Sequence, residues 1–473
     1  MNILFAASEA NPFAKSGGLA DVAGALPKAL KKDGVDARVV MPLYGDLRLR
    51  DTLSYVTNFS VPVGWRSQYC GLFAAERDGV TYYFLDNEYY FKRAGLYGFY
   101  DDGERFAFFS RAVLEMLHYI DFAPDILHCN DWQTGLVPVY LNLYYRHLDR
   151  FKRIKTIFTI HNIAYQGKYG LEILEDTCGI GRRDQHIVEY DGCANFMKGA
   201  IEAADKVTTV SPTYAQEILD PWFSHDLDAL LREKQYKLCG ILNGIDIDAN
   251  DPATDPALAA HYSVKSVGRG KPKCKEALRE HFGLEKDDSP VYAMVSRLVG
   301  MKGLDLVQNI ADALVSEEGI QLVLLGTGEH GYESFFMEFA ARHPGRAGVM
   351  IGFDSKLAQQ IYAGADVFLM PSKSEPCGLA QMVACRYGTI PIVRETGGLR
   401  DSIQDSSKGS GNGFTFREYS AHDLYDACWR AKEAYWKKDD WANLVKYAMQ
   451  CDFSWDVSAK SYEGLYSETV NLW

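Results

Sequence analysis

The sequence predicts an α/β protein with two domains, each a doubly wound parallel sheet with helices on both faces. Three observations support this fold class. First, 473 residues exceed what one hydrophobic core accommodates, so more than one domain is expected. Second, short apolar runs alternate with amphipathic segments in both halves of the chain. Third, a polar segment rich in Pro, Gly and Asp, residues 247–272, separates the two halves.

The N-terminal half begins with the apolar run "NILFAAS" at residues 2–8, which indicates a buried first strand. This run has no basic leader, so a strand is expected here rather than a signal peptide. A helix is predicted from about Gly18 to Lys32, where apolar residues recur at helical spacing. Further strands are predicted at residues 36–42, 125–131, 155–162, 206–212 and 238–246.

The alternation restarts after residue 272 and indicates a second, self-contained sheet. Strands are predicted at residues 291–297, 320–326, 347–352, 366–371 and 389–395. Helices between them are predicted at residues 303–315, 356–365 and 378–387. The boundary between the two domains is expected near Asn243–Asp246.

Composition excludes several classes of partner. The formal net charge is −13 and no long Lys/Arg run occurs, so neither nucleic acid nor an anionic membrane surface is expected as a partner. No apolar stretch reaches the length of a membrane span. The ten cysteines are scattered, without CxxC or metal-site spacing, which predicts reduced thiols and a cytoplasmic location.

The loops that follow the predicted strands carry the candidate functional residues. Ligands of open α/β sheets bind beyond the carboxyl ends of the strands. These loops are "SEANPFAKSGGLADV", "HCNDWQTG" and "TIHNIAYQG" in the first half, and "SRLVGMKG", "GTGE", "PSKSEPCGLAQ" and "RETGGLRDS" in the second. They place glycine beside charged or amide side chains just before helices, where backbone N–H groups bind anions.

The side chains in these loops suit a phosphorylated sugar. Lys15, Arg297 and Lys302 supply positive charge for a diphosphate. The polar groups able to bind sugar hydroxyls or assist proton movement are Glu375, Asp131, His161 and Asn162. Taken singly, each feature has an ordinary explanation: two glycines before a helix serve a turn, and "GTGE" lacks the rest of a dinucleotide fingerprint. Their recurrence at strand ends in both halves favours a ligand site.

Seven motifs occur in order along the chain: "KSGGLADV", "HCNDWQTGL", "TIHNIAYQG", "NGID", "VSRLVGMKGLDL", "SKSEPCGLAQ" and "RETGGLRDSI". Together they resemble the bacterial glycogen synthase and plant starch synthase family over almost the whole chain. The resemblance implies the GT-B architecture, with two Rossmann-like domains facing a central cleft. It further implies an acceptor-side domain at residues 1–243, a nucleotide-sugar domain at residues 244–455, and a C-terminal helix at residues 456–473 that returns to the first domain.

The same resemblance implies a retaining glucosyltransferase. Its members move glucose from a nucleotide diphosphate sugar, usually ADP-glucose, to the non-reducing end of an α-1,4-glucan, which is glycogen, starch or a maltooligosaccharide. It implies no metal and no cofactor, and a location in the cytoplasm, or in the plastid for a plant chain.

The resemblance also assigns residues to roles. It places Lys15, Arg297 and Lys302 at the donor diphosphate, Glu375 at the transferred glucose, and His161 and Asp131 in the glucose pocket; these six are the expected catalytic residues. The expected substrate-binding residues are Lys15, Gly17, Gly18, Asp21, Tyr97, Asn162, Cys377, Gly378, Leu379, Gly397 and Gly398.

Two departures from related patterns are present. The second histidine of the family's HxHDW motif is Asn130 in this chain. Val383 stands where retaining transferases with an E-x7-E pattern have their second glutamate, which favours the synthase branch over other GT-B enzymes.

The purine base of the donor needs a flat apolar slot, and Tyr332 and Tyr362 are predicted as possible stacking faces.

The expected mechanism is electrostatic. The cations stabilise charge that develops on the leaving diphosphate. The sequence offers no pair of carboxylates that predicts a covalent glucosyl intermediate, so front-face attack is the preferred interpretation. Two alternatives stay open at this point: a UDP-sugar transferase of the same architecture with another acceptor, and a non-catalytic glucan-binding protein. Loss of Lys15, Glu375 or Arg297 would favour the latter, and all three are present.

Overall fold

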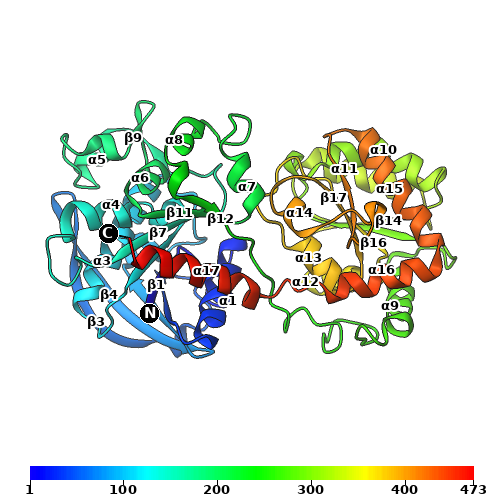
Figure 1. Ribbon diagram of the computed structural model, residues 1–473, viewed down its shortest axis with the longest axis horizontal. Helices are drawn as coiled ribbons and strands as arrows, with labels where there is room; N and C mark the ends of the chain where they lie inside the picture. The colour runs from blue at the N-terminus through cyan, green and yellow to red at the C-terminus, as the bar shows by residue number, and fades with distance from the viewer. Residues whose placement is uncertain (473) are drawn as a thin grey trace. The chain divides into compact units, whose positions relative to one another are not determined.

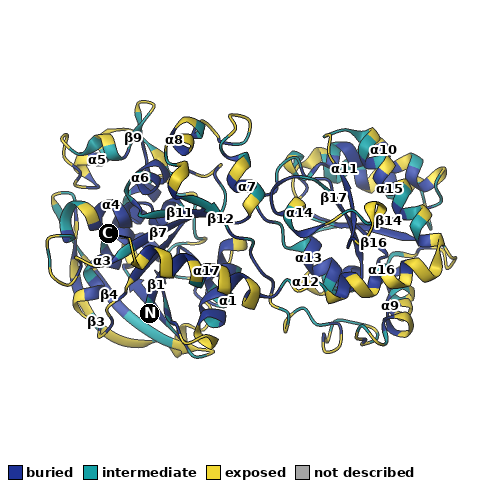
Figure 2. Ribbon diagram, viewed as in Figure 1, coloured by how far each residue is buried: buried dark blue, intermediate teal, exposed yellow. Residues whose placement is uncertain are grey.

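The computed structural model describes residues 1–472, and the chain forms two compact units. The first unit comprises Met1–Ile241 together with the C-terminal segment that begins at Trp455, and the second comprises Leu242–Ser454. Each unit is built on a sheet with helices packed on it (Figure 1). Buried residues are concentrated in the strands and on the sheet-facing sides of the helices (Figure 2).

The first unit contains a nine-stranded sheet in the order β12-β11-β7-β6-β1-β2-β5-β4-β3. β1 lies at its centre between β2 and β6, and its residues Ile3–Ala6 are fully buried. The strands are β1 (Asn2–Ala6), β2 (Asp36–Pro42), β3 (Ser54–Val63), β4 (Arg66–Arg77), β5 (Val80–Asp86), β6 (Ile126–Asn130), β7 (Lys155–Ile160), β11 (Lys206–Thr209) and β12 (Leu238–Gly240).

One edge of this sheet is antiparallel, so the prediction of a wholly parallel sheet is wrong there. β4 runs antiparallel to both β3 and β5. The turn from β4 to β5 consists of Asp78 and Gly79, with φ angles of 50° and 77°. An Asp-Gly pair with two positive φ angles forms the tight hairpin turn that suits twisted strands, and such a connection needs no crossover helix.

The helices of the first unit include α1, which spans the predicted range Gly18–Lys32. The others are α2 (Glu88–Phe91), α3 (Asp102–Glu115), α4 (Leu136–Tyr140), α5 (Glu172–Asp176), α6 (Phe196–Ala203), α7 (Pro212–Glu217), α8 (Asp228–Glu233) and α17 (Trp455–Val470). A small antiparallel sheet adds β8 (Lys168–Tyr169), β10 (Cys193–Asn195) and β9 (Glu189–Tyr190).

The C-terminal helix α17 is part of the first unit. It packs against α1 and β7 (Figure 1). The Tyr466 hydroxyl lies 2.8 Å from Nδ1 of His128, a buried residue of β6. Lys32, at the end of α1, forms an ion pair with Asp456 at 2.9 Å.

The second unit contains a six-stranded parallel sheet in the order β15-β14-β13-β16-β17-β18. Its strands are β13 (Val291–Val295), β14 (Gln321–Gly326), β15 (Ala347–Ile351), β16 (Val367–Met370), β17 (Ile390–Arg394) and β18 (Phe414–Phe416). Its helices are α9 (Val267–Phe282), α10 (Leu304–Ser316), α11 (His330–Arg342), α12 (Ser355–Gly364), α13 (Ala380–Arg386), α14 (Gly397–Ser402), α15 (Ala421–Trp436) and α16 (Lys438–Gln450). The five strands predicted in this half are confirmed.

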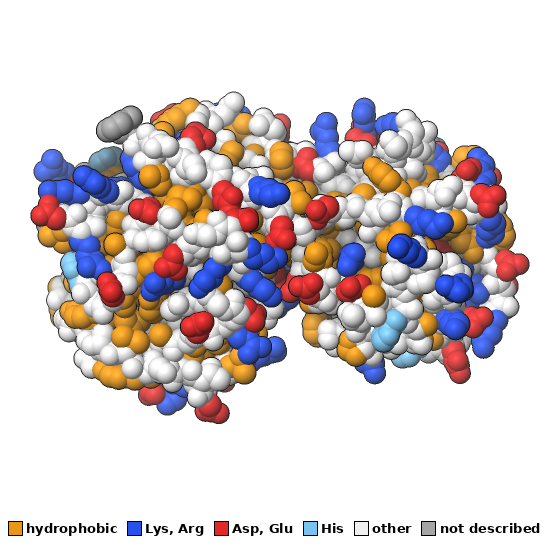
Figure 3. Space-filling view, turned by 60° about the horizontal axis from the view of Figure 1, so that its bottom comes forward, with side chains coloured by type: hydrophobic (Ala, Val, Ile, Leu, Met, Phe, Trp, Pro, Cys, Tyr) orange, Lys and Arg blue, Asp and Glu red, His pale blue; other side chains and the backbone are white. Residues whose placement is uncertain are grey.

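The polar segment 247–272 is not wholly irregular, because α9 already begins at Val267. On the face shown in Figure 3, Lys and Arg side chains lie scattered among Asp and Glu and form no continuous basic band. Within residues 1–472, no helix has both the length and the apolar character that a membrane crossing requires.

Candidate active site

A buried carboxylate holds the loop between β1 and α1. Glu9 is 3% exposed, and its carboxylate accepts hydrogen bonds from the backbone N–H groups of Ser16 and Gly17. Burial raises the pKa of Glu9 above its usual range. Glu9 is absent from the predicted site residues, because a carboxylate that holds its own loop has no recognisable motif.

Lys15, in the same loop, pairs with Asp21 on the first turns of α1. Its Nζ atom donates to both carboxylate oxygens, at 2.7 and 2.8 Å. The two side chains are 48% and 28% exposed, so water screens the pair, and such pairs contribute about 0–1 kcal/mol. Lys15 can therefore exchange Asp21 for an anionic ligand at little cost in free energy.

Neither backbone conformation nor packing requires glycine at positions 17 and 18. Gly17 has a φ of −152°, which any residue adopts. A Cβ atom on Gly17 would lie 3.7 Å from its nearest neighbour, and one on Gly18 would meet no atom within 4 Å. The explanation of this pair as a turn requirement is thus unsupported, and the start of α1 is open to a ligand.

Asp131 follows β6 in an unusual backbone conformation, with a φ of 57°. Non-glycine residues rarely adopt a positive φ, and such strain concentrates at functional sites. Its Oδ1 accepts a hydrogen bond of 2.8 Å from the backbone N–H of His161, and the N–H of Asn162 also donates to the carboxylate. Desolvation nonetheless raises the pKa of Asp131 to about 7, and the nearby charge of Glu9 adds to the shift.

His161, at the end of β7, is oriented by Asn130. Its Nε2 lies 2.9 Å from Oδ1 of Asn130, whose Nδ2 donates to the carbonyls of Ala6 and His128. Because the amide nitrogen is occupied by carbonyls, its oxygen faces the ring and Nε2 carries the hydrogen. Burial lowers the pKa of His161 to about 3, so the ring is neutral near pH 7. The departure at position 130 therefore supplies an acceptor that fixes the tautomer of His161.

The remaining predicted residues of the first unit have local partners. The Tyr97 hydroxyl lies 2.7 Å from Oγ of the buried Ser8. Burial raises the pKa of Tyr97 well above its usual range, and the charges of Glu9 and Asp131 add to this rise. Asn162 accepts a hydrogen bond from the N–H of Ala164 at 3.0 Å and so shapes the turn after β7.

In the second unit, Glu375 and Lys302 form a close ion pair. Glu375 is 8% exposed, and its Oε2 lies 2.5 Å from Nζ of Lys302 and 3.1 Å from Oγ of Ser372. Lys302 ends a 3-10 turn after β13, and Glu375 follows β16. Because β13 and β16 are neighbours and parallel, their carboxyl ends bring the two loops together.

These loops enclose a cavity of about 230 Å³, lined by Arg297, Lys302, Ser372, Glu375, Gly378 and Leu379 among others. Arg297 is exposed, and no hydrogen bond or ion pair engages its side chain within the described part of the chain. The cavity therefore has one free guanidinium and one paired ammonium at its edge, beside a buried carboxylate.

The glycines of the "TGGL" motif have a steric explanation. A Cβ atom on Gly397 would lie 2.0 Å from the carbonyl oxygen of Glu375, and one on Gly398 would lie 2.1 Å from that of Cys377. The start of α14 is thereby pressed against the loop that carries Glu375. Gly397, Gly398 and Cys377 are not among the residues that line the cavity, and a direct contact with substrate stays a prediction for them. Burial raises the pKa of the Cys377 thiol to about 12, so it is unreactive.

The prediction of a purine-stacking face is wrong for Tyr362. This residue is 9% exposed, and its ring packs in the core against Phe368 and Tyr387 at centroid distances of 5.1 and 6.3 Å. Tyr332 is partly exposed, and its hydroxyl borders Gly300, in the same turn as Lys302.

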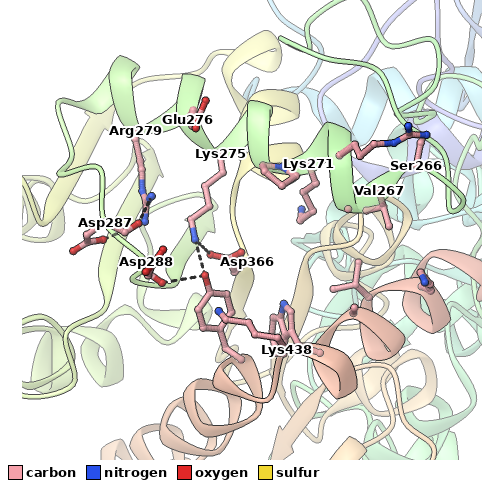
Figure 4. Close-up of a pocket in the computed structure, with 18 of the residues that line it drawn as sticks. Ser266, Val267, Lys271, Lys275, Glu276, Arg279, Asp287, Asp288, Asp366 and Lys438 are labelled. Atoms are coloured by element: carbon pink, nitrogen blue, oxygen red, sulfur yellow. Dashed lines mark hydrogen bonds and ion pairs between the residues drawn. The ribbon is translucent and has the colours of Figure 1, made fainter.

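A larger pocket of about 920 Å³ lies elsewhere in the second unit, between α9, α15 and α16 (Figure 4). Its lining includes Asp287, Asp288 and Asp366, which precede β13 and β16, so it lies at the amino ends of the strands, opposite the candidate site. Lys275 pairs with Asp366 at 2.7 Å, and Arg279 pairs with Asp287 (Figure 4). Lys275 also donates to the hydroxyl of Tyr435 at 3.1 Å, and Arg279 donates to the carbonyl of Ser289. Its buried cations thus have internal partners, which indicates a structural role.

Comparison with known proteins decides the family. Residues 2–233 match the family model "Starch synthase catalytic domain", and residues 276–447 match "Glycosyl transferases group 1". The chain is 52% identical to the glycogen synthase of Geobacillus thermodenitrificans and 51% identical to that of Geobacillus stearothermophilus. Both alignments cover 99% of this chain and 98% of the relative. The chain belongs to the glycogen synthase family.

Solved structures agree with this membership. The catalytic domain of starch synthase IV from Arabidopsis thaliana, bound to ADP and acarbose, superposes with a TM-score of 0.90 at 35% identity, over 100% of this chain and 99% of that one. Sucrose-phosphate synthase from Thermosynechococcus elongatus, with a TM-score of 0.61 at 17% identity, shares the fold. The predicted GT-B class and the predicted glucosyl transfer in glycogen synthesis are confirmed for this glycogen synthase family member.

Proposed function

We propose that the chain transfers glucose from ADP-glucose to the non-reducing end of an α-1,4-glucan, with retention of the anomeric configuration. The observation that carries this proposal is the cavity at the carboxyl ends of β13 and β16, where Arg297 is free of partners within the described residues and Lys302 pairs with Glu375. Two cations beside a buried carboxylate suit a ligand with an anionic diphosphate and a neutral sugar. The ADP bound to starch synthase IV, whose fold this chain shares, supports the choice of nucleotide.

Arg297, Lys302 and Lys15 act on the leaving group. As the glucosyl carbon becomes positive in the transition state, negative charge grows on the departing diphosphate, and these cations stabilise it. In this proposal the second unit is the nucleotide-sugar side and the first unit is the acceptor side.

Glu375, His161 and Asp131 bind the transferred glucose. The neutral ring of His161 uses its Nε2 hydrogen for Asn130, so Nδ1 is left to accept a hydrogen bond from a sugar hydroxyl. Asp131, with a pKa near 7, can accept or donate a hydrogen bond at that sugar.

The acceptor hydroxyl attacks on the face from which the diphosphate departs. A bond forms between the acceptor oxygen and the anomeric carbon, the bond from that carbon to the diphosphate oxygen breaks, and the acceptor proton moves to this oxygen. Retention then requires no second carboxylate as nucleophile.

All ten cysteines are free thiols, which supports a location in the reducing cytoplasm.

The test is incorporation of label into polymer. The protein is incubated with glycogen and radiolabelled ADP-glucose or UDP-glucose at equal, subsaturating concentrations, and the polymer is counted. Faster labelling from ADP-glucose is expected. An equal or faster rate from UDP-glucose would overturn the donor assignment, and no label from either donor would overturn the proposed reaction.

A further inference from the structure

A second groove lies on the surface of the second unit, between residues 406–411, α15 and α16, and has a volume of about 740 Å³. Two large aromatic side chains from different helices line it, Trp429 of α15 and Tyr447 of α16, and each is 45% exposed. Trp441 of α16 also lines it but is 8% exposed. Exposed aromatic rings that converge on one groove mark a binding surface rather than a core.

Arg430 fixes one wall of this groove. Its guanidinium donates to Asp405 and Ser407 of the loop, both at 2.9 Å, and to the carbonyl of Thr415 at 2.8 Å. A further hydrogen bond of 2.8 Å reaches Asp426 on the same helix. The loop is therefore tied to α15, and the groove is formed before any ligand arrives.

The charges of the groove favour a neutral ligand. The charge of Arg430 is taken up by Asp405 and Asp426. The other charged residues of the lining are one cation, Lys437, and two carboxylates, Glu433 and Asp440. No surplus of positive charge is left for a phosphate, in contrast to the cation-rich lining of the pocket in Figure 4.

The groove is remote from the proposed donor site. Phe414, the first residue of β18, lines it. Arg297 and Glu375 follow the carboxyl ends of β13 and β16, and all strands of this sheet are parallel. The amino end of β18 therefore lies at the opposite edge of the sheet from the donor-binding loops.

We propose that this groove binds a segment of the glucan acceptor away from the reaction centre. A glucose ring has apolar C–H faces that stack on aromatic rings, and the hydroxyls on its rim suit the carboxylates of Glu433 and Asp440 and the amide of Asn443. The inference rests on the proposed function, because the polymer acted on by the enzyme is the neutral polyhydroxylated ligand at hand. A polymer held there raises the effective concentration of its chain ends at the enzyme.

The test compares a long and a short acceptor. Trp429→Ala/Tyr447→Ala removes both rings, and Trp436→Ala is the matched control, because Trp436 lies on the same helix and is 48% exposed but does not line the groove. We expect the double variant to require about tenfold more glycogen for half-maximal rate, with kcat and the KM for maltotriose unchanged. Gel electrophoresis through glycogen, without any donor, should show weaker retardation of the double variant only.

Each other outcome overturns the proposal. Unchanged dependence on glycogen removes the site, and equal losses with glycogen and maltotriose place the effect at the reaction centre. A change of oligomeric state in gel filtration assigns the rings to a contact between copies of the chain. Asp440→Ala/Asn443→Ala repeats the test if the aromatic variant fails to fold. Because retardation in glycogen needs no donor, failure of the proposed reaction is recognised separately.

Discussion

The ammonium group of Lys302 lies 2.5 Å from Oε2 of Glu375, although the two residues are 73 positions apart in the chain. The neighbouring parallel strands β13 and β16 bring their loops to one edge of the sheet. Ser372 donates to the same carboxylate oxygen at 3.1 Å, so the position of Glu375 is fixed from two sides. A carboxylate held in this way can orient a sugar without reorganising during the reaction.

Glu375→Gln should abolish most turnover and leave the fold intact. The amide keeps the shape of the side chain but loses the charge, and removal of one such contact costs about 2.7–4 kcal/mol, or roughly 10²–10³ in kcat. The measurement is kcat with saturating ADP-glucose and glycogen, together with Tm. Ser372→Ala is the control, since it keeps both charges and should lose less than about tenfold. Near-normal turnover of Glu375→Gln would remove Glu375 from the reaction.

Lys15→Ala should lower kcat/KM for the donor by about 10² and change the free energy of unfolding by less than about 0.5 kcal/mol. Its exposed pair with Asp21 contributes little to stability, whereas the proposed contact with the diphosphate is lost. Lys28→Ala is matched, because Lys28, on α1, is also a lysine with an exposed ion pair, in which its Nζ lies 3.9 Å from Asp78. Kinetics and chemical denaturation of both variants decide the matter; equal kinetic effects would show that only general surface charge matters.

The sequence predicts the repetitive parts of this fold better than its exceptions. The helical spacing of apolar residues gives α1 with its observed ends, since pattern and structure share one period. The β3–β4–β5 edge is missed because β4 and β5 are joined by the short Asp78-Gly79 turn and not by a helix, so they do not follow the alternation of strands and helices. Tyr362 is misassigned because its burial depends on neighbours contributed by other elements.

The candidate site shows the same division. The charged residues of the loops are recognisable from their motifs, but the groups that position them are not. Asn130 ends β6 and contacts His161, which follows the neighbouring strand β7. Glu9 binds backbone N–H groups, which nearly every residue type provides. Such contacts are set by the tertiary structure and leave no local pattern.

The free energy of unfolding of Asp131→Asn should rise relative to that of the wild-type protein as pH increases. The pKa of Asp131 in the folded state is raised to about 7 from a usual value of 3.8. Between these two pH values, Asp131 therefore holds its proton in the folded state and has lost it in the unfolded state. Stability contributed by the protonated form is therefore lost as pH rises from about 4 to 7, and the asparagine lacks this loss. Between pH 5 and 7.5 the difference in unfolding free energy should shift by roughly 2 kcal/mol in favour of the variant.

Denaturant titrations of both proteins across this range measure the shift. His161, with its pKa lowered to about 3, acts in the opposite direction, but it is present in both proteins and cancels in the difference. A difference that is independent of pH would show that the Asp131 carboxylate is not desolvated as described.

Gly397→Ala should lower the stability of the fold, whereas Gly18→Ala should weaken binding of the donor. At Gly397, where φ is 43°, the added methyl would lie 2.0 Å from the carbonyl oxygen of Glu375, and we expect a loss of at least about 1–3 kcal/mol in stability. At Gly18 the methyl meets open space, so Tm should stay unchanged while the KM for ADP-glucose rises. Thermal unfolding and donor kinetics report both effects. A Gly18→Ala enzyme with normal donor kinetics would show that no ligand approaches this backbone.

Tyr332→Ala should weaken ADP-glucose more than UDP-glucose. The cations of the proposed site bind only the diphosphate that both donors share, so the base must be recognised by another group. Tyr332 is the predicted stacking residue that is partly exposed, and its hydroxyl borders the turn that carries Lys302, within reach of a nucleotide bound there. A purine offers more stacking area than a pyrimidine, so loss of the ring should raise the KM for ADP-glucose about fivefold and that for UDP-glucose less. Tyr332→Phe keeps the ring and should retain the wild-type ratio of the two KM values. Equal effects of Tyr332→Ala on both donors would instead assign the tyrosine to the diphosphate or to the turn, and base selection would then lie with another residue.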